Sequence, residues 1–157
     1  MAKFFLLIIV VAGILLFAGY AFKQGFGASG MGFLGTTTLP ANASYSYANA
    51  SEDAIFVTSP KPGQSITSTI IIKGFARGNW YFEATFPVIV ENDNGLVIGE
   101  GHGNAEGDWM TSSFVPFTAE VDLKTPYTGV ATIVMKKDNP SGDPAKDASL
   151  SFPVILQ

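Results

Sequence analysis

A period of two between residues 79 and 92, read as N-W-Y-F-E-A-T-F-P-V-I-V-E-N, constrains the fold of this chain more than any other feature. Apolar side chains occupy alternate positions of the stretch, at Phe82, Ala84, Phe86, Val88 and Val90. Such alternation is typical of a half-buried β-strand that lays one face against a core. We therefore predict a strand here, in which Pro87 marks a bulge or a side without hydrogen bonds because proline has no N–H to donate.

The strand is followed by a turn signal at Asn92-Asp93-Asn94-Gly95. An Asn-Gly pair supplies the positive φ angles that a tight hairpin turn requires. The next segment, residues 96–99, is therefore predicted to fold back beside the first strand. The sequence indicates a central hairpin.

Other strand-like runs follow one another at short spacing, at residues 55–58, 69–75, 117–123, 129–136 and 150–156. No amphipathic helix of useful length is found after residue 22. About seven short strands with one apolar face each predict an all-β fold, a two-sheet β-sandwich, because each face needs a partner to bury it. Pro153 indicates that the last strand lies at a sheet edge.

Composition excludes several classes of function. The chain has 157 residues, which is room for one domain of ordinary size with appendages. It carries 9 Lys and Arg against 13 Asp and Glu, for a formal net charge of -4, so nucleic acid is not expected as a partner. It has no cysteine, which excludes disulfides, thiolate catalysis and cysteine-ligated zinc.

Residues 4–22 form an uninterrupted run of apolar or small residues between Lys3 and Lys23. A helix of that length spans roughly 28 Å, close to the thickness of a bilayer's hydrocarbon core. We expect residues 1–23 to be a single-pass signal anchor with a cytoplasmic N-terminus, because Lys3 and the terminal amine precede the run. The alternative is cleavage after Ala21, which would release a secreted protein. Either way, the remainder is predicted to be extracytoplasmic.

Residues 24–53 are rich in Gly, Ala, Ser and Thr and have neither a strand nor a helix period. A segment with so little apolar surface to bury cannot offset its backbone entropy, so a flexible tether is expected. The globular domain is then predicted to comprise residues 54–157.

Residues 54–156 resemble the immunoglobulin-like domain of bacterial spore germination, the GerMN-associated Gmad family. The residues that carry the resemblance are Ser59-Pro60, Pro62-Gly63, Gly74-Phe75-Ala76, Trp80, Phe82-Glu83-Ala84, Phe86-Pro87-Val88, Asp93, Gly95, Trp109-Met110, Pro116-Phe117, Gly129 and residues 137–142. The resemblance implies an immunoglobulin-like sandwich in an extracytoplasmic setting and brings no catalytic residues. The chain has neither the GerMN domain nor the lipid-modified cysteine that often accompany this family.

Catalytic and metal-binding signals are weak in this sequence. His102 is the only histidine, and it lies in the glycine-rich stretch 99–108, which is expected to be a solvated loop. Glu83 and Glu91 are predicted to face solvent from one strand, with no cleft between them. Three acidic residues in a late connection are conceivable calcium ligands but fit turn chemistry better: Asp138, Asp143 and Asp147. No catalytic residue, metal or other cofactor is therefore expected.

Contact with a partner is the remaining possibility for the conspicuous side chains. Aromatic residues at strand ends make good surfaces for proteins or sugars, which selects Trp80, Tyr81 and Trp109. Asp138 and Asn139 join them as exposed polar candidates. The alternative for Trp80 and Trp109 is that they plug the ends of the sandwich.

Together these observations predict a membrane-anchored, non-catalytic module for binding or scaffolding at the bacterial cell envelope. It would contact the membrane through residues 4–22 and an unknown envelope protein or glycan through its domain. One alternative is a subunit of a surface fibre or envelope complex, which would leave a long unpaired strand edge for the next subunit. Another is a secreted hydrolase, which would need a rigid constellation around His102 or an acid pair.

Overall fold

The structure is a computed structural model that describes residues 43–157. The expected anchor, residues 1–23, and the first part of the expected tether, residues 24–42, lie outside these residues. Within residues 43–157, no helix has the length and apolar character that crossing a membrane requires.

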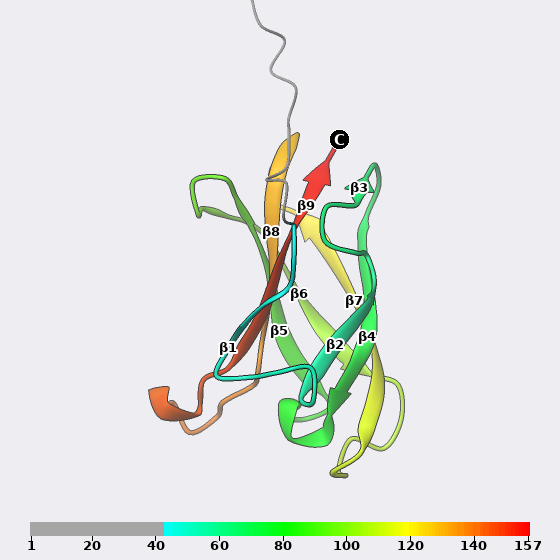
Figure 1. The fold of residues 1–157 in the computed structure, drawn as a ribbon, viewed down its shortest axis with the longest axis vertical. Coiled ribbons are helices and arrows are strands. Elements are labelled where there is room, and N and C mark those ends of the chain that lie inside the picture. The colour runs from blue at the N-terminus through cyan, green and yellow to red at the C-terminus, as the bar shows by residue number, and fades with distance from the viewer. Residues whose placement is uncertain (1–42) are drawn as a thin grey trace, which may run out of the picture. The chain divides into compact units, whose positions relative to one another are not determined.

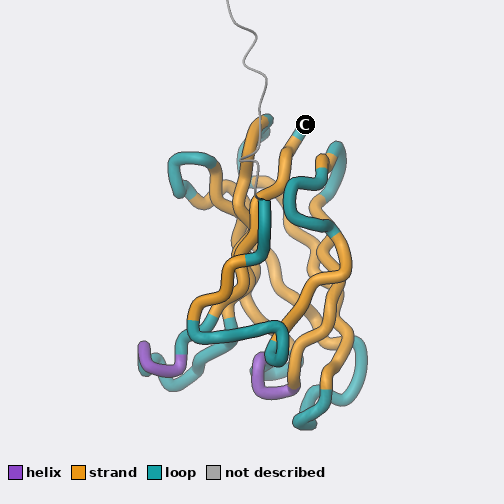
Figure 2. The backbone as a smooth tube through the Cα atoms, viewed as in Figure 1, coloured by secondary structure: helices purple, strands orange, loops and turns teal. Residues whose placement is uncertain are grey.

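The described residues form nine strands and two short 3-10 helices (Figures 1 and 2). The strands are β1 (Ser46–Ala48), β2 (Ile55–Ser59), β3 (Ser65–Ile66), β4 (Ile70–Arg77), β5 (Thr85–Asn92), β6 (Val97–Ala105), β7 (Phe114–Leu123), β8 (Gly129–Lys136) and β9 (Ser149–Leu156). The helices are η1 (Gly78–Trp80) and η2 (Pro144–Lys146).

The strands pair into one continuous sheet in the order β1-β9-β8-β5-β6-β7-β4-β2, with β3 parallel to the end of β9. The sheet curls so that its two halves face each other across a single core (Figure 1). The prediction of an all-β fold is confirmed. The two expected layers are halves of one curled sheet, joined by the ladder between β5 and β6.

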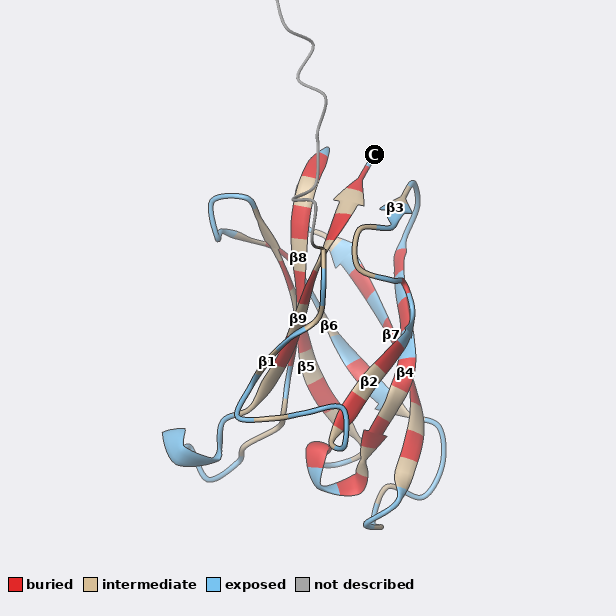
Figure 3. Ribbon diagram, viewed as in Figure 1, coloured by how far each residue is buried: buried red, intermediate tan, exposed pale blue. Residues whose placement is uncertain are grey.

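The core follows the predicted alternation, and buried positions recur at every second residue along the strands (Figure 3). Phe86, Val88 and Val90 of β5 point inward and are fully buried. Three aromatic rings surround Phe86, with centroids at 4.9 Å for Phe117, 5.4 Å for Tyr81 and 6.4 Å for Trp80. The pairs with Phe117 and Trp80 are edge-to-face, and such packing adds to the stabilisation from burial alone. Phe86 is the centre of an aromatic core.

The prediction that β5 begins near residue 79 is wrong, because the strand starts at Thr85. Glu83 and Ala84 both have positive φ, 51° and 65°, and form a two-residue hairpin turn. Phe82 and Thr85 exchange both backbone hydrogen bonds across it, at 3.0 and 3.1 Å. The turn breaks the period of two, so Tyr81 is buried and Phe82 is 42% exposed, the reverse of the expectation.

This turn uses residues that rarely adopt positive φ, since the conformation costs a non-glycine residue roughly 1–2 kcal/mol. Glycine removes that cost but loses roughly 0.5–1 kcal/mol of backbone entropy. Ala84→Gly is therefore expected to raise the free energy of unfolding by about 0.5–1 kcal/mol, measured by urea denaturation. A loss of stability in Ala84→Gly would show that the alanine methyl group contributes more than the strain costs.

The glycine-rich stretch expected to be a loop is largely strand β6, which runs to Ala105. Gly99, Gly101 and Gly103 occupy the inward positions, where a Cβ would collide with neighbouring atoms at Gly101 and Gly103 and would be tightly packed at Gly99. At Gly103 the colliding group is the ring of Phe86. Glycine in a strand marks such close approaches, and here it lets the two halves of the sheet meet at the β5–β6 corner. His102 is exposed, as expected, but on the outer face of a strand.

Pro87 and Pro153, two of the three prolines within the described strands, lie where they interrupt no ladder. Pro87 pairs with His102 of β6 but precedes Val88, the first residue of β5 that pairs with β8. The one irregularity of this hairpin lies elsewhere, between Val90 and Glu91. Pro153 does not mark an edge strand, because β9 has neighbours on both sides; it lies between the parts of β9 that pair with β1 and with β3.

Strand β1 lies inside the segment expected to be a tether, so the folded domain begins before residue 54. Tyr45 and Tyr47 pack against the core, and their hydroxyls donate to the carbonyls of Val57 (3.2 Å) and Ile55 (3.3 Å) in β2. These bonds bridge the two edge strands and almost close the sheet into a barrel. They also cover carbonyls that an added strand would need, which argues against the fibre alternative.

This seam between β1 and β2 gives stability a pH dependence. Burial, and secondarily the Glu52 carboxylate, raises the pKa of Tyr45 and of Tyr47 above 10.0. The folded state therefore holds these protons more tightly than the unfolded chain. Their contribution to stability is fully present below about pH 10 and is lost as the pH rises through the folded pKa values.

We expect the free energy of unfolding to fall above about pH 10 and to fall less in the Tyr45→Phe, Tyr47→Phe double variant, which has no proton to lose at the seam. Denaturant unfolding at a series of pH values measures this. An equal alkaline loss in both proteins would contradict the account of the seam.

Candidate functional site

The antiparallel order of the strands gathers four connections at one end of the domain, which we call the loop end (Figures 1 and 2). It is formed by residues 49–54, 78–84, 106–113 and 137–148. The C-terminus lies at the opposite end (Figure 1). Strand β1 also starts toward that opposite end, because it runs antiparallel to β9 with Ser46 opposite Ser151.

All five residues selected from the sequence lie on these connections, and two of them are buried. Trp80 is 1% exposed and Tyr81 is 4% exposed, so neither ring offers a contact surface. The Tyr81 hydroxyl donates to the Val115 carbonyl at 3.0 Å, whereas the Trp80 indole nitrogen is buried without a hydrogen-bond partner in the described residues. Trp109 is partly buried against the core. Both tryptophans therefore pack against the end of the core, which is the alternative to a contact role that the sequence left open for them.

Arg77, at the end of β4, forms hydrogen bonds to two of the connections, residues 49–54 and 106–113. Its guanidinium donates to the carbonyls of Asp53 (2.6 Å) and Ser112 (2.9 Å). The same group lies 4.4 Å from the centroid of the Phe114 ring, a cation–π arrangement. Sequence reasoning did not select Arg77, because its partners are backbone atoms far from it in the chain.

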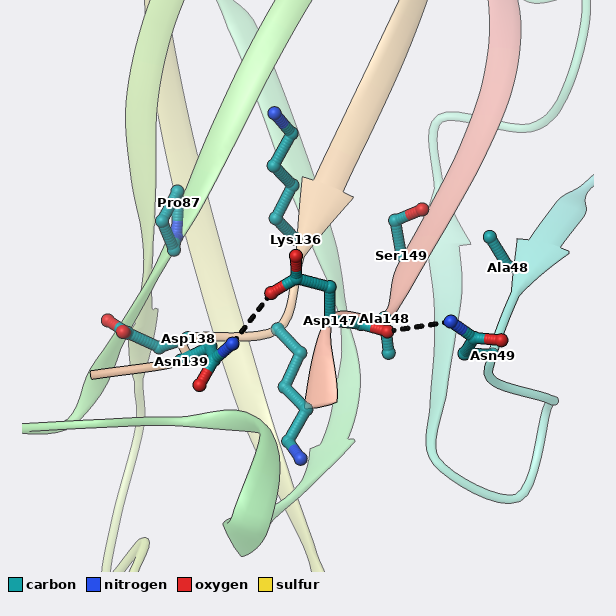
Figure 4. Close-up of a pocket in the computed structure, with 10 residues that line it drawn as sticks. Ala48, Asn49, Pro87, Lys136, Asp138, Asn139, Asp147, Ala148 and Ser149 are labelled. Carbon is teal, nitrogen blue, oxygen red and sulfur yellow. Dashed lines mark hydrogen bonds between the residues drawn. The ribbon is translucent and has the colours of Figure 1, made fainter. Parts of the chain in front are cut away.

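Asn139 organises the longest connection. Its side-chain amide donates to the Asp143 carbonyl (2.8 Å) and to the Asp147 carboxylate (2.7 Å), and its oxygen accepts from the Ser141 hydroxyl (2.6 Å). Asn49 of the neighbouring connection donates to the Asp147 carbonyl at 3.0 Å (Figure 4). These bonds occupy Asn139 within the protein and hold residues 137–148 in one shape. Turn chemistry, as expected, accounts for this acidic segment.

Asp138 is held beside the core but keeps its side chain free. Its backbone N–H donates to the Trp80 carbonyl at 3.0 Å, which joins two connections of the loop end. Its carboxylate has no hydrogen-bond or ion-pair partner among residues 43–157, where the ion pair that forms is Lys124–Glu100, at 2.8 Å. In that part of the chain no three His, Cys, Asp or Glu residues lie close enough to hold a metal ion.

Two adjoining hollows, together called the loop cleft, open beside Asp138. The larger, of about 450 Å³, lies in the fork where β5 leaves β8, between Pro87 and Lys136 (Figure 4). The smaller, of about 270 Å³, has Phe82 in its wall. Lys137, Asp138 and Asn139 line both. The larger volume is that of a small-ligand site, a class of site that combines apolar surface with a few polar groups.

Phe82 and Lys136 are members of the loop cleft that sequence reasoning missed. The sequence pattern placed Phe82 on the buried face of a strand. The turn at Glu83 and Ala84 that exposes it contains no glycine or asparagine, so nothing in the sequence indicated it. Lys136 was expected as the last residue of a strand. The gap that it borders depends on how far β5 and β8 pair, which a sequence does not state.

The acidic residues and the histidine that were considered for catalysis lie apart from the loop cleft. Glu83 lies in the turn and Glu91 on β5, so they do not share a strand face across a cleft. His102 is opposite Glu120 of β7 on the outer surface of the sheet. None of these three residues lines the loop cleft.

The sequence of this domain matches a known protein family. The family model described as the immunoglobulin-like domain of bacterial spore germination matches residues 54–143, more than half of the chain. The chain belongs to this family. A search of curated proteins and a search of solved structures gave no match. The match to the spore-germination immunoglobulin-like domain covers β2 to β8 and ends within the 137–148 connection, so β1 and β9 complete the sheet beyond it.

Proposed function

We propose that this protein is a membrane-anchored, extracytoplasmic, non-catalytic module that binds a component of the bacterial cell envelope through its loop end. The observation that carries the proposal is that the two ends of the domain differ. Four connections and the loop cleft lie at one end, whereas β1 begins toward the other. A domain attached through its N-terminal segment would turn the loop end away from the membrane.

Family membership supports the setting. An immunoglobulin-like domain of bacterial spore germination is consistent with an extracytoplasmic module, and the family is not known for catalysis. Binding by loops at one end of a rigid sandwich is how this class of fold commonly acts. The apolar run at residues 4–22 supplies the proposed anchor, and cleavage after Ala21 would convert the same module into a secreted one.

Protease treatment of intact spheroplasts tests the anchoring and orientation. Exposed segments of small residues are preferred cleavage sites, so protease should cut between residues 24 and 42 and release a folded fragment. The fragment should retain Tyr45 and Tyr47, because both pack on the core. Release only after lysis of the cells would place the domain in the cytoplasm and contradict the proposal.

A further inference from the structure

We propose that the loop cleft is a carbohydrate-binding site in which the ring of Phe82 stacks on the apolar face of a sugar. This inference rests on the proposed binding function and names the chemistry of its ligand. The site is the smaller hollow with Phe82, Lys137 and Asp138, extended by the larger hollow beside Lys136.

Phe82 is held in place as a platform. Its backbone is pinned by both hydrogen bonds to Thr85 across the two-residue turn. The turn itself keeps two non-glycine residues at positive φ, which is costly and is typical of functional positions. The ring is 42% exposed, although a residue of this size and apolar character is usually buried. A fixed, half-exposed ring presents one face to a ligand at little entropic cost.

The walls beside Phe82 supply hydrogen bonds. Lys137 and Lys146 offer ammonium donors, and the Asp138 carboxylate offers acceptors; none of the three has an ion-pair partner within the described residues. The bonds of Asn139 fix the connection that carries them, so the groups are arranged before a ligand arrives. Donors and acceptors around one apolar ring match a sugar, which has hydroxyl groups at its rim and C–H groups on its face.

The composition of the cleft favours a sugar over a protein partner. The cores of protein interfaces are depleted in Lys, Asp and Ser, and their hot spots are dry apolar pockets. The hollow beside Phe82 has the opposite character, with two lysines, one aspartate and one serine around the one exposed ring, since the Tyr81 ring that also borders it is buried. Basic and acidic groups are mixed within it, which favours an uncharged chain of hydroxyl- and amide-bearing sugars over a polyanion.

The test uses the full-length chain in detergent and two probes: peptidoglycan freed of protein, and a soluble tetramer of N-acetylglucosamine. Wild type is expected to sediment with the first and to bind the second in calorimetry. Phe82→Ala and Asp138→Ala should each weaken binding about tenfold or more, whereas Phe82→Trp should retain it because it keeps an aromatic face. Met110→Ala is the matched control, since Met110 is 78% exposed on another connection and lines neither hollow.

Two results would overturn the inference. One is equal binding by wild type and Phe82→Ala, which would place any sugar contact elsewhere. The other is no binding to either probe while the chain still binds cell envelopes in a protease-sensitive manner. That second result would identify a protein partner, and would leave the proposed envelope-binding function standing. Loss of binding to envelopes of every kind would contradict both.

Discussion

Phe86→Ala is expected to lower the free energy of unfolding by about 3–5 kcal/mol, the usual cost of removing a large buried aromatic side chain. Phe86 is fully buried and touches the rings of Trp80, Tyr81 and Phe117. The surrounding strands belong to one hydrogen-bonded sheet, so they cannot move inward to fill the cavity that the Phe86 ring would leave. Urea or guanidinium denaturation of the purified chain measures the change.

Phe82→Ala is the matched control, since it removes the same side chain four residues earlier. Phe82 is half exposed on its turn, so the loss there is expected to stay near 1 kcal/mol or below. Similar losses at Phe82 and Phe86 would mean that the faces of this segment have been assigned wrongly. The same control shows that Phe82→Ala is folded when its ligand binding is measured.

Gly103→Ala is expected to destabilise the domain by about 1–3 kcal/mol, although alanine usually stabilises a strand relative to glycine. The reason is that the new Cβ would enter the space held by the Phe86 ring. Denaturant unfolding again provides the measurement.

A second substitution tests that cause. Adding Phe86→Leu, which shortens the opposing side chain, should recover part of the loss at Gly103→Ala, and the coupling between the two sites should exceed about 0.5 kcal/mol. Asn104→Ala, one residue further along β6 and exposed, should stay within about 0.5 kcal/mol. Strict additivity of the Gly103 and Phe86 substitutions would contradict the packing proposed for the corner.

Side-chain periodicity was sufficient to predict most of this fold. The strand-like run at 129–136 and the alternation along 150–156 identified β8 and β9 almost residue for residue. The Asn94-Gly95 signal correctly marked the β5–β6 hairpin, although of the pair only Gly95 has positive φ, 75°. These signals are local: each strand buries one face, and each turn needs a particular backbone angle.

The failures have a common physical origin in contacts between distant residues. The glycines of β6 read as a loop because their role depends on Phe86 and Val121, which pack where side chains would be. Strand β1 was hidden in a polar segment because two tyrosine side chains reach the core and the β2 edge. The turn at Glu83 and Ala84 uses residues that carry no turn signal.

The sequence predicted where the candidate site lies better than it predicted which side chains form it. Trp80, Tyr81, Trp109, Asp138 and Asn139 all lie at the loop end, yet two are core residues and Asn139 is committed to its own connection. Of these five residues, only Asp138 keeps a free polar group in the loop cleft. The exposed ring that completes the cleft, Phe82, follows from a turn that only the structure shows.

Site-specific photo-crosslinking in intact bacteria tests the central claim, that the loop end is the binding surface. A benzophenone amino acid is placed at Phe82 in one full-length chain and at Leu96 in another, because both residues are exposed apolar side chains on hairpins at opposite ends of the domain. Illumination is predicted to join the Phe82 variant to an envelope macromolecule and to leave the Leu96 variant free. Crosslinks at Leu96 alone, or equally at both positions, would contradict the claim.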